Sequence, residues 1–493
     1  MGLLSIALLS SMALGQDTPS DAEWTQAFAE YDSAISSGNK AGGADVLVAM
    51  LQDPEQAVFH GEAYVSLGDI LRSMDLHYAG LMAYSKALSL GELAPDGTVE
   101  KALEAADNVG DPALLEPVFG ANVGLKSNKE ARSRMGWLAA KENYRQGNYG
   151  VAIGILSLVD AQSERFVDAQ HLKGIILCQQ GRYEDALAPL LTAEAKAEDS
   201  QLLEVIRINL GRAYFGAGNF SRAIEYYAKV PRGSTQWIQA QFERAWAHFR
   251  LEDISGTLGI LHTQVSPFFE ESYHPEAWLL RTYSLFLLCK FPEASRQIES
   301  FRARYSPVRD TLEEVLSRAD DGQLVGQLRA HSEGRETLVP AELLADFASE
   351  PRMKASMAAI DQADDELARL RNVSSNPFSD FVAQWVHARR QELVLTEGAR
   401  IRARLDASLA QMTTMINDTD ITRLDIIRLE RRLYEQASIT GEIANVRETA
   451  QRKGYVQRGY RSWPYEGEYW ADELGYYRAN VKPECPATLR PGG

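Results

Sequence analysis

Gly147-Asn-Tyr149, Gly181-Arg-Tyr183 and Gly218-Asn-Phe220 recur at nearly regular distances, and a more divergent copy follows at Glu252-Asp-Ile254. Each stretch follows an amphipathic segment, and a small residue stands three positions after its last residue. The distance from Gly147 to Gly181, and from Gly218 to Glu252, is 34 residues; from Gly181 to Gly218 it is 37. This period predicts a chain of repeated helix–turn–helix units rather than one compact enzyme core.

A period of 34 residues is typical of tetratricopeptide repeats (TPR), whose paired helices approach closely where a small residue faces a large one. Residues 64–90 show this pattern first, with Gly68 and Gly80 expected to admit the bulk of Tyr84 and Leu71. Gly174, Gly211 and Ala245 occupy the small position in later repeats. We therefore predict an all-α fold, a TPR superhelical solenoid.

Breaks in the helical pattern give the expected domain organisation. Pro307 ends the last recognisable repeat, and the segment after it is interrupted at Gly322, Gly326, Gly334 and Pro340. Apolar residues at helical spacing among many charges then predict two or three long helices, packed as a bundle or an antiparallel coiled coil. The predicted segments are 1–15 (signal peptide), 16–60 (N-terminal helices), 61–307 (about six repeats, one degenerate), 308–350 (linker or capping helices), 351–453 (long helices) and 454–493 (aromatic tail).

Composition excludes some classes of function. The 493 residues carry a formal charge of −17, which disfavours nucleic acid as a partner because phosphate binding needs a clustered basic surface. No stretch after the N-terminus approaches the roughly 20 apolar residues of a membrane helix, so we expect no transmembrane segment in the mature chain. The absence of such a segment is compatible with peripheral association with a membrane complex.

The N-terminus resembles a secretory signal. Residues 3–14 are apolar and small, and Ala13-Leu-Gly15 offers a cleavage site before Gln16. The first basic residue is Lys40, so a basic n-region is absent. We expect a periplasmic protein, the alternatives being a truncated reading frame or a buried N-terminal helix.

Three cysteines are too few for a disulfide framework. Cys178 and Cys289 lie in helical apolar patterns, where small core residues are the simplest interpretation. The sequence does not decide whether Cys485, in the tail, forms a disulfide.

Motifs for catalysis are absent from the sequence. It contains no H-E-x-x-H, G-x-S-x-G or P-loop pattern, and its histidines are scattered. Gly216-Ala-Gly218 follows a helix rather than a strand, and the repeat period accounts for it. We expect no enzyme, no cofactor and no metal, while a hydrolase with an unrecognised site is a third, weaker hypothesis.

The first helices of a TPR array face a concave surface, and aligning the repeats predicts which residues lie there. Aromatic and basic residues alternate on this surface, which suits a peptide or an acidic segment. The other interpretation is that these aromatics fill the core between repeats. The candidate partner-binding residues are Trp137, Lys141, Tyr144, Arg145, His171, Arg212, Phe215, Trp246 and Arg250.

The aromatic tail is not explained by the repeats. Its rings are too dense for a disordered composition, so they are expected to pack. We expect Trp463, Tyr469, Trp470 and Tyr477 to dock onto the helical bundle; the alternative is a ligand site for a cation or a cell-wall glycan.

The tail also carries a family resemblance. Together with the signal-like start, the repeats and Phe301-Arg-Ala-Arg-Tyr305-Ser-Pro307, the run Trp463-Pro-Tyr465-Glu-Gly-Glu468-Tyr469-Trp470-Ala-Asp-Glu-Leu-Gly475-Tyr-Tyr477 resembles periplasmic TPR proteins of delta-proteobacteria, of the adventurous gliding motility protein T type. The resemblance implies a non-catalytic scaffold in an envelope-spanning assembly.

We therefore expect a protein–protein interaction scaffold whose partners are proteins of the cell envelope, such as parts of a gliding motility apparatus. The alternative is a peptide- or glycan-binding module for outer-membrane or cell-wall assembly.

Overall fold

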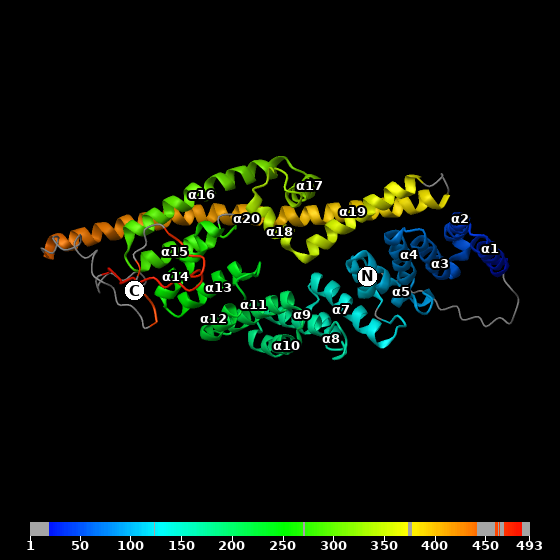
Figure 1. Cartoon of the computed structure of the whole chain (residues 1–493), viewed down its shortest axis with the longest axis horizontal. Helices are drawn as coiled ribbons and strands as arrows, with labels where there is room; N and C mark the ends of the chain where they lie inside the picture. The colour runs from blue at the N-terminus through cyan, green and yellow to red at the C-terminus, as the bar shows by residue number, and fades with distance from the viewer. Residues whose placement is uncertain are drawn as a thin grey trace, which may run out of the picture. The chain divides into compact units, whose positions relative to one another are not determined.

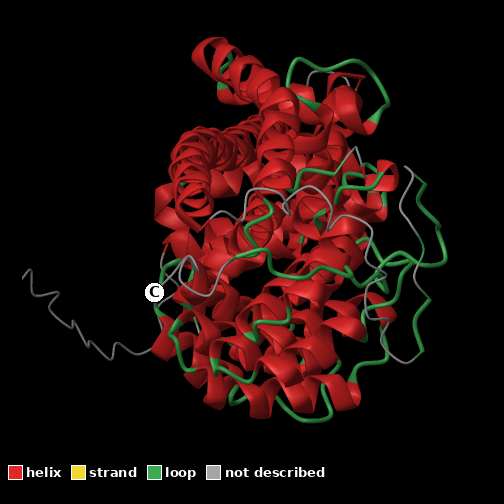
Figure 2. Ribbon diagram, turned by 90° about the vertical axis from the view of Figure 1, so that its left-hand side faces the viewer, coloured by secondary structure: helices red, strands yellow, loops and turns green. Residues whose placement is uncertain are grey.

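The computed structural model describes residues 19–122, 124–269, 272–372, 377–440, 459–461, 463 and 468–485. These residues form twenty α-helices and four short 3₁₀ helices, with no strand among them (Figure 2). This confirms the predicted all-α solenoid. The chain divides into two compact units, which we describe separately.

Unit 1 comprises residues 1–146 and 358–392. Seven helices belong to its N-terminal part, and segments of α19 (Pro351–Asn372) and α20 (Pro377–Thr440) complete it. The seven helices are α1 (Pro19–Ser36), α2 (Lys40–Gln52), α3 (His60–Ser73), α4 (His77–Ser89), α5 (Thr98–Val109), α6 (Glu116–Ala121) and α7 (Lys129–Arg145).

Unit 2 comprises residues 147–357 and 393–493. Its repeats are followed by two further helices, α17 and α18, and by the remaining parts of α19 and α20 (Figure 1). The helices are α8 (Tyr149–Leu156), α9 (Phe166–Gln179), α10 (Tyr183–Lys196), α11 (Ser200–Gly216), α12 (Phe220–Ala228), α13 (Trp237–Arg250), α14 (Ile254–Gln264), α15 (Pro275–Leu287), α16 (Phe291–Arg318), α17 (Asp321–Ser332) and α18 (Ala341–Ser349).

One backbone feature recurs at the turn of every helix pair: a residue in the left-handed conformation. Eight such residues follow one another at intervals of 34 to 37 residues, namely Gly38, Asp75, Gly110, Gly147, Gly181, Gly218, Glu252 and Cys289. The left-handed residue lets the next amide reach back to the ending helix, as when Arg182 N donates to Leu177 O at 2.9 Å. The series begins at Gly38, so α1 and α2 form a helix pair with the same kind of turn.

Close helix contacts follow the predicted small positions in part. A Cβ atom added to Gly68 would lie 2.5 Å from the ring of Tyr84, and one added to Gly211 would lie 2.4 Å from the ring of Tyr227. The prediction for Gly80 was wrong in its partner, because this glycine faces the aliphatic stem of Arg72. A glycine sixteen residues before a large ring therefore sets the distance between two helices of a pair.

The predicted end of the array at Pro307 was wrong. Helix α16 continues through Pro307 to Arg318. Proline removes one backbone hydrogen bond, to the carbonyl of Ala303, and both residues lie on the exposed side of the helix, where water can replace it.

The predicted interruptions at Gly322 and Gly326 are also absent, because α17 contains both glycines. Asp320 and Gln323 form a capping box that starts this helix and outweighs the low helix propensity of glycine.

The long helices pack on the repeats rather than only on each other. In unit 2, α20 lies beside α16 (Figure 1), with Arg302 Nη1 2.6 Å from Asp420 Oδ1. Arg402 of α20 likewise lies 2.6 Å from Asp321 at the start of α17. The two long helices therefore brace the array as well as pairing with each other, as when Arg390 of α20 contacts Asp364 of α19. Residues 441–453 lie outside the described residues.

Candidate functional site

Four of the predicted binding residues lie on α7 in unit 1, and their cations bind a carboxylate of the same unit. Lys141 Nζ lies 2.5 Å from Glu116 and 4.6 Å from the ring centroid of Trp137. Arg145 contacts both Glu116 and Glu142, and Tyr144 is half-buried. Glu116 is only 2% exposed. Lys141 and Arg145 therefore neutralise a buried charge before any partner arrives.

In unit 2 the first helices carry a polar ladder. His171 on α9 is buried and shares a 2.7 Å hydrogen bond with Asn209 on α11, whose amide nitrogen donates to Nε2. Arg212, one turn further along α11, donates from Nε to both carboxylate oxygens of Glu243 on α13 at 3.0 Å. The ladder links successive first helices, so His171 and Arg212 hold the register of the array.

We expect low pH to destabilise this ladder by protonating His171. Burial lowers the pKa of His171 to about 4, against about 6.5 in an unfolded chain. Between these values the unfolded chain binds more protons, so the stability that neutral His171 supplies is present above pH 6.5 and is lost as the pH falls toward 4. We predict that His171→Gln makes the free energy of unfolding less sensitive to pH in this window, by at most about 1.4 kcal/mol per pH unit.

Urea unfolding at pH 7, 6 and 5 measures this. The exposed His387 provides the control variant, His387→Gln. Equal pH slopes for wild type and His171→Gln would show that His171 does not contribute.

The remaining aromatic candidates, Phe215 and Trp246, lie on α11 and α13. We define the aromatic row as these two residues together with Phe249 on α13 and Tyr283 on α15. Trp246 is 36% exposed and Tyr283 is 43% exposed, so both rings offer apolar surface to a partner. Phe249 packs edge-on against Trp246 with ring centroids 5.6 Å apart. The row therefore combines rigid packing with an accessible apolar surface.

Arg250 lies at the end of this row, with its guanidinium 4.7 Å from the ring centroid of Phe220 and 6.0 Å from that of Phe215. Among the four cations predicted to bind a partner, three face intramolecular carboxylates and Arg250 lies on aromatic rings. This arrangement suits a partner with apolar side chains better than a strongly acidic one. Binding by these residues stays a prediction.

The C-terminal tail forms a second feature that crosses the repeats of unit 2, and we call residues 468–485 the strap (Figure 1). Tyr469 stacks on His262 of α14 at 4.5 Å, and Tyr477 meets the same ring edge-on at 5.0 Å. Leu474 is the buried anchor, 5% exposed in a cluster with Trp237.

The tail prediction was correct only for two rings, because Trp463 is 66% exposed and Trp470 is 43% exposed. The two docked rings lie on α14 of the repeats, while Ala479 and Val481 share an apolar cluster with Ile426 of α20. Tyr465, which belongs to the same run, lies outside the described residues.

A disulfide fastens the end of the strap. It joins Cys289, the left-handed residue between α15 and α16, to Cys485. The interpretation of Cys289 as a free core residue was therefore wrong, while Cys178 is free and half-buried. Helical spacing places a cysteine on a buried face but carries no information about a partner 196 residues away.

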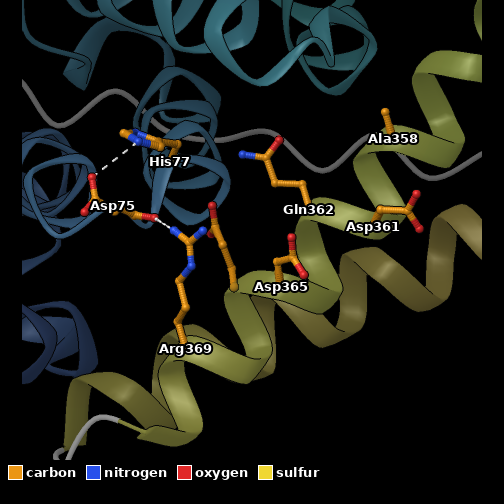
Figure 3. A pocket seen from close by; sticks show the side chains of 8 residues that line it. Asp75, His77, Ala358, Asp361, Gln362, Asp365 and Arg369 are labelled. Atoms are coloured by element: carbon orange, nitrogen blue, oxygen red, sulfur yellow. Dashed lines mark hydrogen bonds and ion pairs between the residues drawn. The ribbon is translucent and has the colours of Figure 1, made fainter.

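Unit 1 contains a cavity of about 390 Å³ between the turn after α3 and helix α19 (Figure 3). Its buried carboxylate, Glu366, accepts hydrogen bonds from Tyr78 N at 2.6 Å and Ala79 N at 2.9 Å, and so caps α4. Burial raises the pKa of Glu366, although these two bonds oppose the rise. Arg369 donates to Asp75 O at 2.7 Å. The lining residues thus brace the fold.

Two other kinds of site are absent from the part of the chain that the structure describes. It contains no group of three or more His, Cys, Asp or Glu side chains that could hold a metal ion. Within the same described residues, no helix is both long and apolar enough to cross a membrane.

Comparison with known proteins gives little further guidance. No family model matches the chain, and no curated protein matches it. Among solved structures, the crystal structure of the APC/C hetero-tetramer Cut9–Hcn1 is similar at 11% identity, covering 82% of this chain and 96% of that one, with a TM-score of 0.20. A likeness at this level carries no argument about function.

Proposed function

We propose that this chain is a non-catalytic scaffold of the bacterial cell envelope, and that the aromatic row of unit 2 holds a segment of a partner protein. The observation that carries the proposal is the exposure of Trp246 and Tyr283 at the same repeat register on α13 and α15. Large rings in a rigid frame bind protein segments at low entropic cost. A helical-repeat fold supplies such extended surfaces.

The double substitution Trp246→Ala and Tyr283→Ala tests the row. We expect recovery of the partner from cross-linked envelopes to fall at least about tenfold, as for loss of interface anchors. The thermal midpoint should change little, because both rings are already partly exposed. Leu191→Ala with Leu158→Ala removes exposed apolar side chains elsewhere and is the control. Unchanged recovery with the row removed would contradict the proposal.

The envelope location rests on two supports. The sequence begins with a signal-like segment, and Cys289 and Cys485 form a disulfide of the kind that persists in oxidising compartments. The resemblance to gliding motility proteins adds one candidate assembly. Alkylation of the native protein in cell extracts tests the location: we expect only Cys178 to react before reduction, whereas three reactive cysteines would contradict it.

A second candidate function, binding of cell-wall glycan, is favoured by Trp463 and Trp470. Their ring centroids lie 5.4 Å apart and both rings are exposed. Exposed indole pairs offer apolar faces for the C–H surface of a sugar. Co-sedimentation with purified cell-wall glycan should be lost in Trp470→Ala if this function applies, and sedimentation unaffected by the substitution would reject it.

A further inference from the structure

The strap lies directly on the backbone of α14, in a groove that glycine makes possible. A Cβ atom added to Gly259 would lie 2.0 Å from the carbonyl oxygen of Tyr477. Gly475 adopts a left-handed conformation with φ +84°, and a Cβ there would lie 2.7 Å from the ring of Trp237. Any side chain at Gly259 therefore excludes the strap, while the three nearest atoms to that position all belong to the strap.

The groove holds the strap largely through its main chain. Gly475 N donates to Thr263 Oγ1 at 2.8 Å, and Ala479 N donates to Ser255 O at 3.0 Å. Ser255 Oγ donates in return to Ala479 O at 2.6 Å. Main-chain bonds of this kind bind an extended segment of many sequences, so specificity must come from side chains.

Beside the rings of Tyr469 and Tyr477 on His262, two further side chains of the strap contribute to that specificity. Leu474 fills an apolar pocket beside Trp237 and Ala240. Four residues later, Arg478 Nη2 lies 2.6 Å from Asp253 Oδ1. A hydrogen bond from His248 lowers the pKa of Asp253, so the groove presents a fixed negative charge to this arginine. The groove thus recognises a leucine, a following glycine and a basic residue.

The far end of the strap is locked beside the turn after α15. Glu484 N donates to Leu288 O at 2.8 Å, and Lys290 Nζ lies 2.5 Å from Glu484. The Cys289–Cys485 bond then keeps the C-terminal end of the strap at this turn until the bond is reduced. A dithiol reductant converts this disulfide to two thiols and is itself oxidised to a disulfide, which leaves only non-covalent contacts to hold the strap.

We infer that the groove formed by Trp237, Asp253, Ser255, Gly259 and Thr263 is a second peptide-binding surface. Its occupant in the oxidised protein is the chain's own strap. When the Cys289–Cys485 bond is open, the groove accepts an extended segment of a partner protein that carries Leu-Gly followed by a basic residue. This surface is separate from the aromatic row, so an experiment can disprove one proposal without affecting the other.

A labelled peptide with the sequence of residues 472–482 is the probe. The receiving protein is the full chain with Cys289→Ser and Cys485→Ser to open the lock, and Leu474→Asp to expel its own strap. We expect fluorescence anisotropy to show at least tenfold tighter binding to this variant than to oxidised wild type. A tethered strap otherwise competes at roughly millimolar effective concentration.

The matched control adds Gly259→Val, whose Cβ would occupy the place of the strap backbone, and should abolish binding. A probe in which Leu474 is replaced by Asp and Arg478 by Glu should also fail. Absence of binding to the opened variant, with its helical content and thermal midpoint retained, would overturn the inference. So would equal binding to oxidised wild type.

Hydrogen exchange of the wild type tests whether the disulfide holds the strap, and this test does not depend on the folding of the variant. Reduction with dithiothreitol should accelerate exchange of the Gly475 and Ala479 amides at least tenfold while the amides of α9–α11 keep their rates. Unchanged exchange at Gly475 and Ala479 after verified reduction would show that the disulfide does not control the groove.

Discussion

Replacing Lys141 and Arg145 together by alanine is expected to lower the free energy of unfolding of unit 1 by about 3 kcal/mol. Both cations contact Glu116, which is buried at the start of α6. Removing them leaves a buried carboxylate without an opposite charge, and such a charge is costly in an apolar environment. These residues therefore cannot be used to test partner binding by simple alanine substitution.

The matched rescue is Glu116→Gln in the same background, which removes the buried charge while keeping the side-chain volume. We expect it to recover at least half of the lost stability. Lys126→Ala, which removes an exposed ion pair with Asp96, should cost no more than about 0.5 kcal/mol. Native-state hydrogen exchange of α5 and α7 reports this unit separately. A triple variant no more stable than the double variant would show that the loss arises elsewhere.

Gly211→Ala is expected to destabilise unit 2 by about 2 kcal/mol, whereas Gly154→Ala should stabilise it by about 0.5 kcal/mol. Both glycines lie inside helices, so both substitutions gain the same helix propensity. The added methyl at Gly211 would lie 2.4 Å from the buried ring of Tyr227, while nothing lies within 4 Å of a Cβ at Gly154. Overpacking outweighs propensity only at the first site.

Urea unfolding of the two variants measures this difference in sign. The test separates the packing role of the small position from a general effect of glycine on the unfolded chain. Equal shifts of the two midpoints, in either direction, would contradict the account of how the helix pairs approach one another.

The periodic part of the chain was predictable because each repeat encodes its own turn and small position. Gly147, Gly181 and Gly218 mark turns that only a left-handed residue can make, and glycine adopts that conformation at little cost. The same turns at Asp75, Glu252 and Cys289 lack glycine, so their period is harder to recognise.

The left-handed conformation of these three non-glycine residues has a common structural explanation. Each is held by a distant segment: Asp75 O accepts from Arg369, Asp253 beside Glu252 pairs with Arg478, and Cys289 is bonded to Cys485. External contacts of this kind can offset the strain of a left-handed non-glycine residue. Contacts so distant in sequence leave no periodic signal, which is why the sequence did not show where the tail and the long helices contact the repeats.

The position of the candidate residues in the repeats was predictable, but their internal partners were not. Repeat register places Arg212 and Trp246 on first helices, and the structure has them there. The register does not predict Glu243, which binds Arg212, because Glu243 lies in the next repeat at a position without a fixed residue type. The aromatic row, rather than the cations, is therefore the part of the prediction that leaves an accessible surface.

Position-specific photo-cross-linking in living cells tests the central claim most directly. A benzophenone amino acid placed at Trp246 should give one discrete covalent adduct with a partner protein, and Tyr283→Ala should reduce its yield several-fold. The same amino acid at Leu191, on α10, is the control and should give none. An adduct at Leu191 with none at Trp246 would contradict the proposal that this scaffold holds its partner on the aromatic row.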